Sequence, residues 1–337
     1  MTGFLTIDNV SRLFGPNLNM GEKIAARLGA NVETRSVRAV ADVTLTIRKG
    51  ETLGLVGESG CGKSTLGRLI AGILAPTSGS VSLEGAPVMV DRRKVTTRVQ
   101  TVFQDPFASL DPRMKVGDTV SEGPIAHGLT TRSEAREYVS GWFERVGLDP
   151  VWVDRYPHQF SGGQRQRIAI ARALAMQPDV LICDEPVASL DVSIQAHIVN
   201  LFLELNRDLG LTCVFISHDL SVVRHLSDRV AVMYLGRIIE LGPVAQVFGA
   251  PAHPYTAALI GSVPKLVLDA DELVRFDRIE GEVPSPLSPP SGCAYHPRCP
   301  RATAICAATQ PAPRSVAALR SVSCHHFEGQ LAAAAGE

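Results

Sequence analysis

One short segment constrains this chain more than any other, because an apolar strand, a glycine-rich loop and a helix follow one another there without a gap. The strand pattern covers Thr52 to Val56 and the helical spacing covers Ser64 to Leu74. Between them lies the loop Gly57-Glu58-Ser59-Gly60-Cys61-Gly62-Lys63-Ser64-Thr65. Glycines let backbone N–H groups turn inward, and the start of a helix adds partial positive charge. The segment therefore predicts a phosphate-binding loop at residues 57–65.

Two side chains of this loop have predicted roles. Lys63 is expected to reach the outer phosphates, and Ser64 to offer its hydroxyl to Mg²⁺. Two alternatives stay open from the residues alone. The loop can be an ordinary glycine-rich turn, and Cys61 is either a thiol activated at a helix N-terminus or a small residue tolerated in the loop.

A pair of carboxylates marks a second candidate site. Asp184 and Glu185 directly follow the strand pattern Val180 to Cys183. Adjacent side chains on a strand point in opposite directions, so the two acids can serve different partners. Asp184 is predicted to join the Mg²⁺ shell, and Glu185 to activate a water in line with the terminal phosphate. The alternative is a buried strand that happens to end in exposed acids.

Strand and helix patterns alternate through the second half of the chain. Because this alternation is typical of parallel sheets, we expect an α/β fold. Further helices are expected near residues 132–146 and 163–176. The alternating elements are predicted as strands at 180–183, 212–216 and 229–234 and helices at 192–209 and 220–226.

Composition excludes some functions. The net charge of −1 lacks the basic excess of a nucleic-acid-binding protein, so no nucleic-acid partner is expected. No stretch approaches the roughly 18 apolar residues of a spanning helix, and the first ten residues do not read as an export signal. We therefore expect a cytoplasmic protein with one large domain and an appendage.

The run Phe160-Ser161-Gly162-Gly163-Gln164-Arg165-Gln166-Arg167 resembles the signature of the ATP-binding cassette (ABC) family. Other family marks follow in the family's order: Gln104 in a glutamine-bearing loop, Ser189-Leu190-Asp191 after the acids, and His218 as a switch histidine. Each of these marks alone is weak evidence for the family, because a lone histidine is usually a surface or core residue and Ser-Leu-Asp makes a plausible helix cap.

The resemblance implies roles for these residues. Glu185, His218 and Gln104 would be catalytic, and Gln104 would also join Ser64 and Asp184 around Mg²⁺. The residues implied to contact ATP outside the 57–65 loop are Phe14, Ser161, Gly162, Gly163, Gln164 and Asp191. For Phe14, stacking on adenine competes with ordinary packing, since residues 16–38 form an insertion beside it.

The resemblance also implies an architecture. Residues 1–262 would form a P-loop nucleotide-binding domain with an inserted helical subdomain at about residues 105–175. Two such domains would dimerise head to tail, and each ATP would lie between the loop of one chain and the Ser161 segment of the other.

Further segments, including Arg155-Tyr156-Pro157-His158 and His253-Pro254-Tyr255-Thr256, resemble the F-type ATPase subunits of dipeptide and oligopeptide importers. This implies a peripheral protein at the cytoplasmic face of the membrane. Its implied partners are a second, different ATPase subunit, two transmembrane permease subunits and an extracytoplasmic binding protein. The alternatives are an ATPase for nickel or another solute, a non-transport ABC ATPase and a regulatory module without turnover.

Four of the seven cysteines fall close together near the C-terminus, at Cys293, Cys299, Cys306 and Cys324. Cytosolic thiols resist disulfide formation, which favours metal ligation. The surrounding sequence resembles tails that hold a [4Fe-4S] cluster, with Zn²⁺ or free thiols as alternatives. We therefore expect a linker at 263–291, a metal-binding tail at 292–327 and a disordered end at 328–337.

Overall fold

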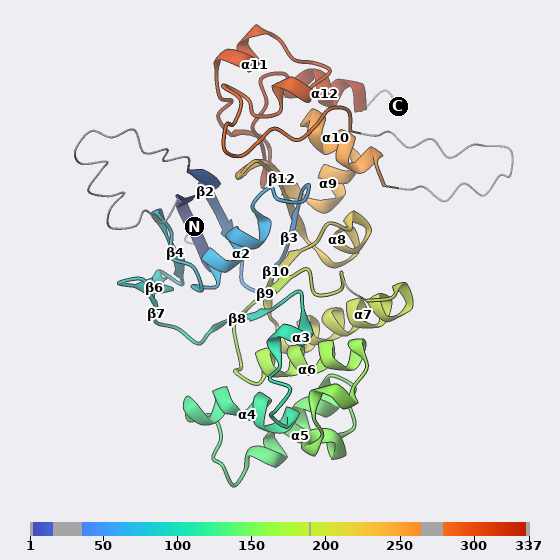
Figure 1. Ribbon diagram of the computed structural model, residues 1–337. Coiled ribbons are helices and arrows are strands. Elements are labelled where there is room, and N and C mark those ends of the chain that lie inside the picture. Colours follow the sequence, from blue (N-terminus) through green and yellow to red (C-terminus); the bar gives the residue numbers. More distant parts are fainter. Residues whose placement is uncertain (1–2, 16–35, 189, 264–278, 335–337) are drawn as a thin grey trace, which may run out of the picture.

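The computed structural model describes residues 3–15, 36–188, 190–263 and 279–334 (Figure 1). The long axis of the molecule runs from a lobe of helices at residues 106–174, through two sheets in the middle, to the C-terminal segment at residues 296–334. The insertion predicted at 16–38 lies mostly outside the described residues, as does half of the predicted linker.

An eight-stranded sheet forms the centre. Its order is β13-β14-β12-β11-β3-β10-β9-β8, and the five strands from β11 to β8 are parallel. The sheet consists of β3 (Thr52–Val56), β8 (Val99–Val102), β9 (Val180–Asp184), β10 (Thr212–Ile216), β11 (Arg229–Tyr234), β12 (Arg237–Pro243), β13 (Arg314–Ala317) and β14 (Arg320–Val322). The predicted α/β class with a parallel-rich sheet is confirmed.

Helices cover the sheet because its strands are apolar on both sides. Along β9, Val180 and Ile182 join the core that contains α2, whereas Leu181 and Cys183 join the core that contains α6 to α8. Such alternation follows from the period of two in a strand. The helices are α2 (Lys63–Ile70), α7 (Val192–Leu209), α8 (Leu220–Leu226), α9 (Val244–Gly249) and α10 (Pro254–Gly261).

A second sheet, which is antiparallel, packs on the α2 side. Its order is β2-β1-β4-β5, and a small ribbon of β6 and β7 lies beyond it. The bounds are β1 (Leu5–Phe14), β2 (Val37–Ile47), β4 (Ser78–Leu83), β5 (Ala86–Pro87), β6 (Met89–Val90) and β7 (Arg93–Lys94). This sheet places β2 against β12 of the central sheet and against α2.

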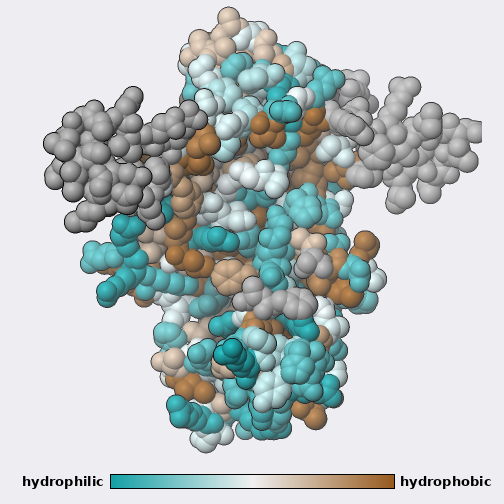
Figure 2. Space-filling model, viewed as in Figure 1, coloured by the Kyte–Doolittle hydropathy of each residue, from teal (hydrophilic) through white to brown (hydrophobic). Residues whose placement is uncertain are grey.

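The predicted helical subdomain is the lobe between β8 and β9, at the bottom of Figure 1. Its surface in Figure 2 is mainly hydrophilic, with scattered apolar side chains. No helix within the described ranges is both long and apolar enough to cross a bilayer. The lobe contains α3 (Pro106–Ser109), α4 (Val116–Ala126), α5 (Ala135–Arg145), η1 (Pro150–Asp154), η2 (Pro157–Gln159) and α6 (Gly162–Leu174).

The C-terminal segment differs from the predicted separate unit, because it extends the central sheet. β14 pairs with β12, and the carboxylate of Glu240 on β12 accepts a hydrogen bond from Arg320 on β14 at 2.8 Å. Both side chains are buried, and Glu240 also accepts from the amides of Ala252 and His253. The segment contains η3 (His296–Arg298), α11 (Ala304–Ala308) and α12 (Phe327–Ala334).

The end of the chain also departs from expectation. Residues 328–337 were expected to be disordered, but α12 covers most of them. Phe327 and Leu331 pack against Val322 and Cys324, so this helix has an apolar anchor. Residues 335–337 lie outside the described part.

The Glu240–Arg320 pair yields a test of how firmly the tail is attached. Arg320→Ala leaves a buried carboxylate without its cation, so we expect the free energy of unfolding to fall by about 3–5 kcal/mol. Urea titration followed by circular dichroism measures it. Arg314→Ala, at an exposed position of β13, is the control, with a change below about 0.5 kcal/mol. Equal effects of the two substitutions would contradict this role of the pair.

Candidate functional site

The glycine-rich loop lies where predicted, between the end of β3 and the start of α2. The ammonium of Lys63 donates to the carbonyl oxygens of Gly57 at 2.8 Å and Glu58 at 3.0 Å. The side chain therefore bridges the loop from inside and is 5% exposed. An ammonium group held at the centre of a backbone loop is suited to bind an anion that enters the loop.

Two glycines of the loop are required by close backbone contacts. A Cβ on Gly57 would lie 2.2 Å from the carbonyl oxygen of Met233, and one on Gly62 would lie 2.1 Å from that of Ala39. Both residues also have positive φ angles, 151° and 107°. Neither position can accept a side chain without moving the strand behind it, which is β11 for Gly57 and β2 for Gly62.

Ser64 and Asp184 meet at the candidate metal position. The Ser64 hydroxyl donates to Oδ1 of Asp184 at 2.7 Å, which joins the first turn of α2 to the end of β9. Burial raises the pKa of Asp184, while the hydrogen bond from Ser64 and the charge of Arg68 act in the opposite direction. A hydroxyl and a carboxylate oxygen side by side are ligands that suit Mg²⁺.

Glu185 points to a different set of partners. The backbone turns sharply there, with φ at +48°, and the Glu185 amide donates to the carbonyl of Ile216. Oε2 of Glu185 accepts from the Gln104 amide at 3.1 Å and lies 3.3 Å from Nδ1 of His218. The structure thus brings together all three side chains that were implied to be catalytic.

The Ser161 segment forms the N-terminus of α6. Ser161 Oγ accepts from the Gln164 amide, and the Gln164 side chain accepts from the Ser161 amide, which makes a capping box. Ser161 and Gly162 are not buried, so the start of the helix remains accessible. Asp191 is the exposed N-cap of α7, while Ser189 lies outside the described residues.

A pocket of about 290 Å³ contains the core of the site. Ser59 to Thr65 line it together with Gln104 and Glu185, whereas the segment from Ser161 to Gln164 does not. Phe14 is not a lining residue either. It is 41% exposed, lies under the guanidinium of Arg12, and pairs across the sheet with Val37, which does line the pocket. Its stacking role stays a prediction.

The thiol of Cys61 is buried, and burial raises its pKa despite the nearby charge of Lys63. A raised pKa disfavours the thiolate, so the structure favours the interpretation that Cys61 is a small residue tolerated in the loop.

The metal centre predicted for the C-terminal cysteines is not supported. Among residues 3–15, 36–188, 190–263 and 279–334, no group of three or more histidine, cysteine, aspartate or glutamate side chains is arranged to hold a metal ion. Burial raises the pKa of Cys293 and Cys299, and raises that of Cys324 to about 11. The sulfur of Cys324 accepts from the His326 amide instead. All seven cysteines are free.

Sequence analysis missed the contacts that hold the loop from behind. The Glu58 amide donates to the Tyr255 hydroxyl at 2.9 Å, and the Glu58 carboxylate pairs with Arg298 at 2.8 Å. Pro286 of the predicted linker even lines the pocket. Of these residues, only Tyr255 had been singled out, within the run His253-Pro254-Tyr255-Thr256. That run indicated a family resemblance and no contact with the loop.

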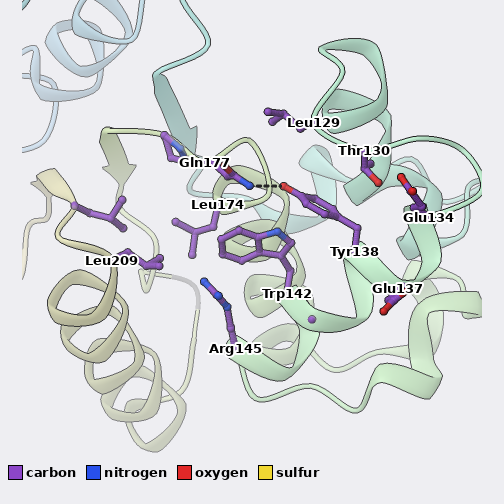
Figure 3. Close-up of a pocket in the computed structure, with 13 residues that line it drawn as sticks. Leu129, Thr130, Glu134, Glu137, Tyr138, Trp142, Arg145, Leu174, Gln177 and Leu209 are labelled. Atoms are coloured by element: carbon purple, nitrogen blue, oxygen red, sulfur yellow. Dashed lines mark hydrogen bonds between the residues drawn. The ribbon is translucent and has the colours of Figure 1, made fainter.

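A second pocket, of about 760 Å³, lies in the helical subdomain (Figure 3). Tyr138 and Trp142 of α5 line it, and Gln177 donates to the Tyr138 hydroxyl. The guanidinium of Arg145 stacks on Trp142. Its described lining includes no residue of the 57–65 loop, so we do not assign the phosphate site to it.

Comparison with family models gives two matches. Residues 40–188 match the ABC transporter model, and residues 239–306 match the model of the oligopeptide/dipeptide transporter C-terminal region. The first range contains the loop and both acids, and the second contains Tyr255 and Arg298.

Curated relatives are similar over most of their length. The oligopeptide transport ATP-binding protein OppF of Escherichia coli is 50% identical over 283 residues, which are 82% of this chain and 84% of OppF. The di/tripeptide transport ATP-binding protein DppF of Pseudomonas aeruginosa is 49% identical, over 87% of this chain and 91% of DppF.

Solved structures share the fold. The ABC transporter component cbiO1 from Clostridium perfringens has a TM-score of 0.59 at 31% identity, over 73% of this chain and 90% of cbiO1. A dimeric bacterial ABC transporter cassette has a TM-score of 0.60 at 27% identity, over 71% of this chain and 98% of the cassette.

The position of Lys63 leads to a prediction for ligand binding. Lys63→Ala removes the charged donor inside the loop, so we expect the Kd for a fluorescent ATP analogue to rise about 10- to 100-fold. Fluorescence titration measures it, and Lys49→Ala, at an exposed position before β3, is the control. Equal affinities in the two variants would mean that the loop is only a turn.

Proposed function

This chain belongs to the ABC transporter family, and we propose that it is the subunit that hydrolyses ATP to drive peptide import through membrane permease subunits. One observation carries the proposal. The Ser64–Asp184 pair and the Glu185 carboxylate with its two partners converge on the ends of the strands beside the phosphate-binding loop. Metal, phosphate and attacking water can therefore be held by neighbouring groups.

Binding would be the task of the loop. Its inward amides and Lys63 attract the phosphates, and Ser64 with Asp184 would hold Mg²⁺, with Gln104 as a further implied ligand. When bound, Mg²⁺ neutralises phosphate charge. The oxygen donors at this position fit that ion, because a hydroxyl already lies 2.7 Å from a carboxylate oxygen there.

Glu185 is suited to accept the proton of the attacking water. Its carboxylate has 17% of its surface exposed, so water can reach it, while Gln104 and His218 fix its orientation. A base that is held by two neighbours loses little orientational freedom when the reaction occurs. This arrangement supports turnover and disfavours a regulatory module without hydrolysis.

The accessible start of α6 supports a shared site. Ser161, Gly162 and Gly163 open α6 and do not line the pocket of their own chain, so the amides of Gly162 and Gly163 are available to the phosphate of another chain. We accordingly propose a head-to-tail dimer with a second ATPase subunit, in which Gln164 and Asp191 also face the shared nucleotide. A heterodimer at the cytoplasmic face of the membrane, served by an extracytoplasmic binding protein, completes the proposal.

Peptides are the favoured solute. The similar curated proteins are named for oligopeptide and di/tripeptide transport, and the C-terminal region matches the model of that group. The structure of this subunit gives no reason to prefer nickel or another solute, or a function outside transport.

The role of Glu185 gives the main test. Glu185→Gln keeps the shape but removes the base, so ATP turnover by the assembled transporter should fall about 10²- to 10⁴-fold. Phosphate release measures turnover, and titration with the ATP analogue should show that binding survives.

Glu144→Gln, at an exposed position of α5, serves as the matched control and should leave turnover unchanged. Turnover of the Glu185→Gln variant at the control level would refute the assignment of the base and with it the proposed hydrolysis.

The [4Fe-4S] cluster implied for the tail stays a proposal, with Zn²⁺ as the alternative ion. Cys293, Cys299, Cys306 and Cys324 line one small pocket, and four thiolates are the ligand set of such a cluster. The buried His253 also lines this pocket, and its Nε2 has no hydrogen-bond partner among the described residues. An unsatisfied donor beside four thiols fits a sulfur-rich group.

Metal analysis of anaerobically purified protein tests this part separately. We expect about four iron atoms per chain and broad absorbance near 400 nm, both lost in a Cys299→Ser variant. Cys213→Ser, at a buried thiol of β10, is the control and should keep the iron. Zinc in place of iron would favour the alternative ion, and metal-free protein would contradict the proposal.

A further inference from the structure

We propose that Arg298 is a positioning residue for the phosphate-binding loop, through which the C-terminal segment sets the affinity for nucleotide. The inference rests on the proposed function, because it concerns the same nucleotide site. Arg298 itself is not a lining residue of the pocket, so it acts through Glu58.

The contact between Arg298 and Glu58 is a two-pronged ion pair. Nη1 of Arg298 donates to Oε2 of Glu58 at 2.8 Å, and Nη2 donates to Oε1 at 3.0 Å. The arginine side chain is 4% exposed and the glutamate side chain 22%. A guanidinium that engages both carboxylate oxygens fixes the direction of that carboxylate as well as its charge.

Glu58 is held at every polar group. Its amide donates to the Tyr255 hydroxyl, its carbonyl accepts from Lys63, and its carboxylate accepts from Arg298. These partners come from α10, α2 and η3. One residue of the loop is therefore fixed by three elements, and one of them belongs to the C-terminal segment.

Aromatic rings also connect the C-terminal segment with residues that contact the loop. The ring of Tyr295 contacts the rings of Tyr234 and Tyr255, with centroids 5.4 Å and 5.3 Å apart. Arg298 also donates from Nε to the carbonyl of Glu280 at 3.1 Å. Arg298 thus connects Glu280, in the predicted linker, with Glu58 of the phosphate-binding loop. Pro286, which lines the pocket, follows Glu280 by a few residues.

The pair has an electrostatic consequence. Glu58 places a negative charge one residue from a pocket that must attract phosphate, and Arg298 compensates it. Without the arginine, a partly buried carboxylate would repel the incoming anion. The substitution should therefore change nucleotide affinity. Among the described residues, Glu185 and its partners Gln104 and His218 share no hydrogen bond or ion pair with Arg298, so they should keep their orientation.

The test compares Arg298→Ala, Arg298→Lys and the double variant Arg298→Ala/Glu58→Gln in the full chain. Titration with a fluorescent ATP analogue gives Kd, and hydrolysis by the assembled transporter gives KM and kcat. We expect Arg298→Ala to raise Kd and KM about 10-fold or more while kcat stays within about twofold. Arg298→Lys should recover part of the affinity, because it keeps the charge but loses the fork.

The double variant separates charge compensation from simple structural support. Removing the carboxylate as well should restore most of the affinity lost in Arg298→Ala. Arg314→Ala, which removes an exposed arginine of β13, should match the parent. A Kd of Arg298→Ala equal to that of this control would overturn the proposal, and so would a double variant no better than Arg298→Ala alone.

Failure of this inference is distinguishable from failure of the proposed function. The Kd series needs only binding of the analogue, whereas the proposed function depends on the loss of turnover in Glu185→Gln. If Arg298→Ala is too unstable to purify, Arg298→Gln removes the charge with less loss of packing, and its comparison with Arg298→Gln/Glu58→Gln gives the same two outcomes.

Discussion

The conformation of the glycine-rich loop is the constraint on which the rest of the structure depends. A loop whose amides must bind an anion can use few of them for hydrogen bonds within the loop, such as the one from the Cys61 amide to the Glu58 carbonyl, so much of its shape is imposed from outside. The strand β11 presses against Gly57, Lys63 spans the loop from within, and Tyr255 with Arg298 secures Glu58. Preorganisation of this kind removes the cost of ordering the loop when the ligand arrives.

Local patterns predicted the central sheet well. The strands β3, β10 and β11 and the helices α7 and α8 begin and end where their apolar periodicity indicated. Buried parallel strands carry long apolar runs, and the helices between them have a clear apolar face, so the signal is strong. The antiparallel sheet of β1, β2 and β4 was missed as a unit, because its strands pair across sequence separations that periodicity does not report.

The candidate site was predictable to the extent that its residues are contiguous. Residues 57–65 and the pair Asp184 and Glu185 form recognisable sequence motifs. Gln104 and His218 were identified only through the resemblance to the ABC family. The role of Arg298 was not predicted, because the cysteines and histidines around it indicated a metal site rather than a contact with the loop. The tail was expected to fold apart from the core, but short strands with exposed side chains, such as β13, carry no alternation that could reveal their place in the sheet.

The ion pair between Glu58 and Arg298 joins residues 240 positions apart in the chain, which has a consequence for the newly made protein. At ordinary rates of translation, on the order of tens of seconds pass between synthesis of the two residues. During that time the loop exists, but its glutamate has no guanidinium partner. If Arg298 has the proposed role, a ribosome-bound chain that ends before this residue carries a nucleotide site of reduced affinity. The site is then completed when the segment around η3 (His296–Arg298) leaves the ribosome.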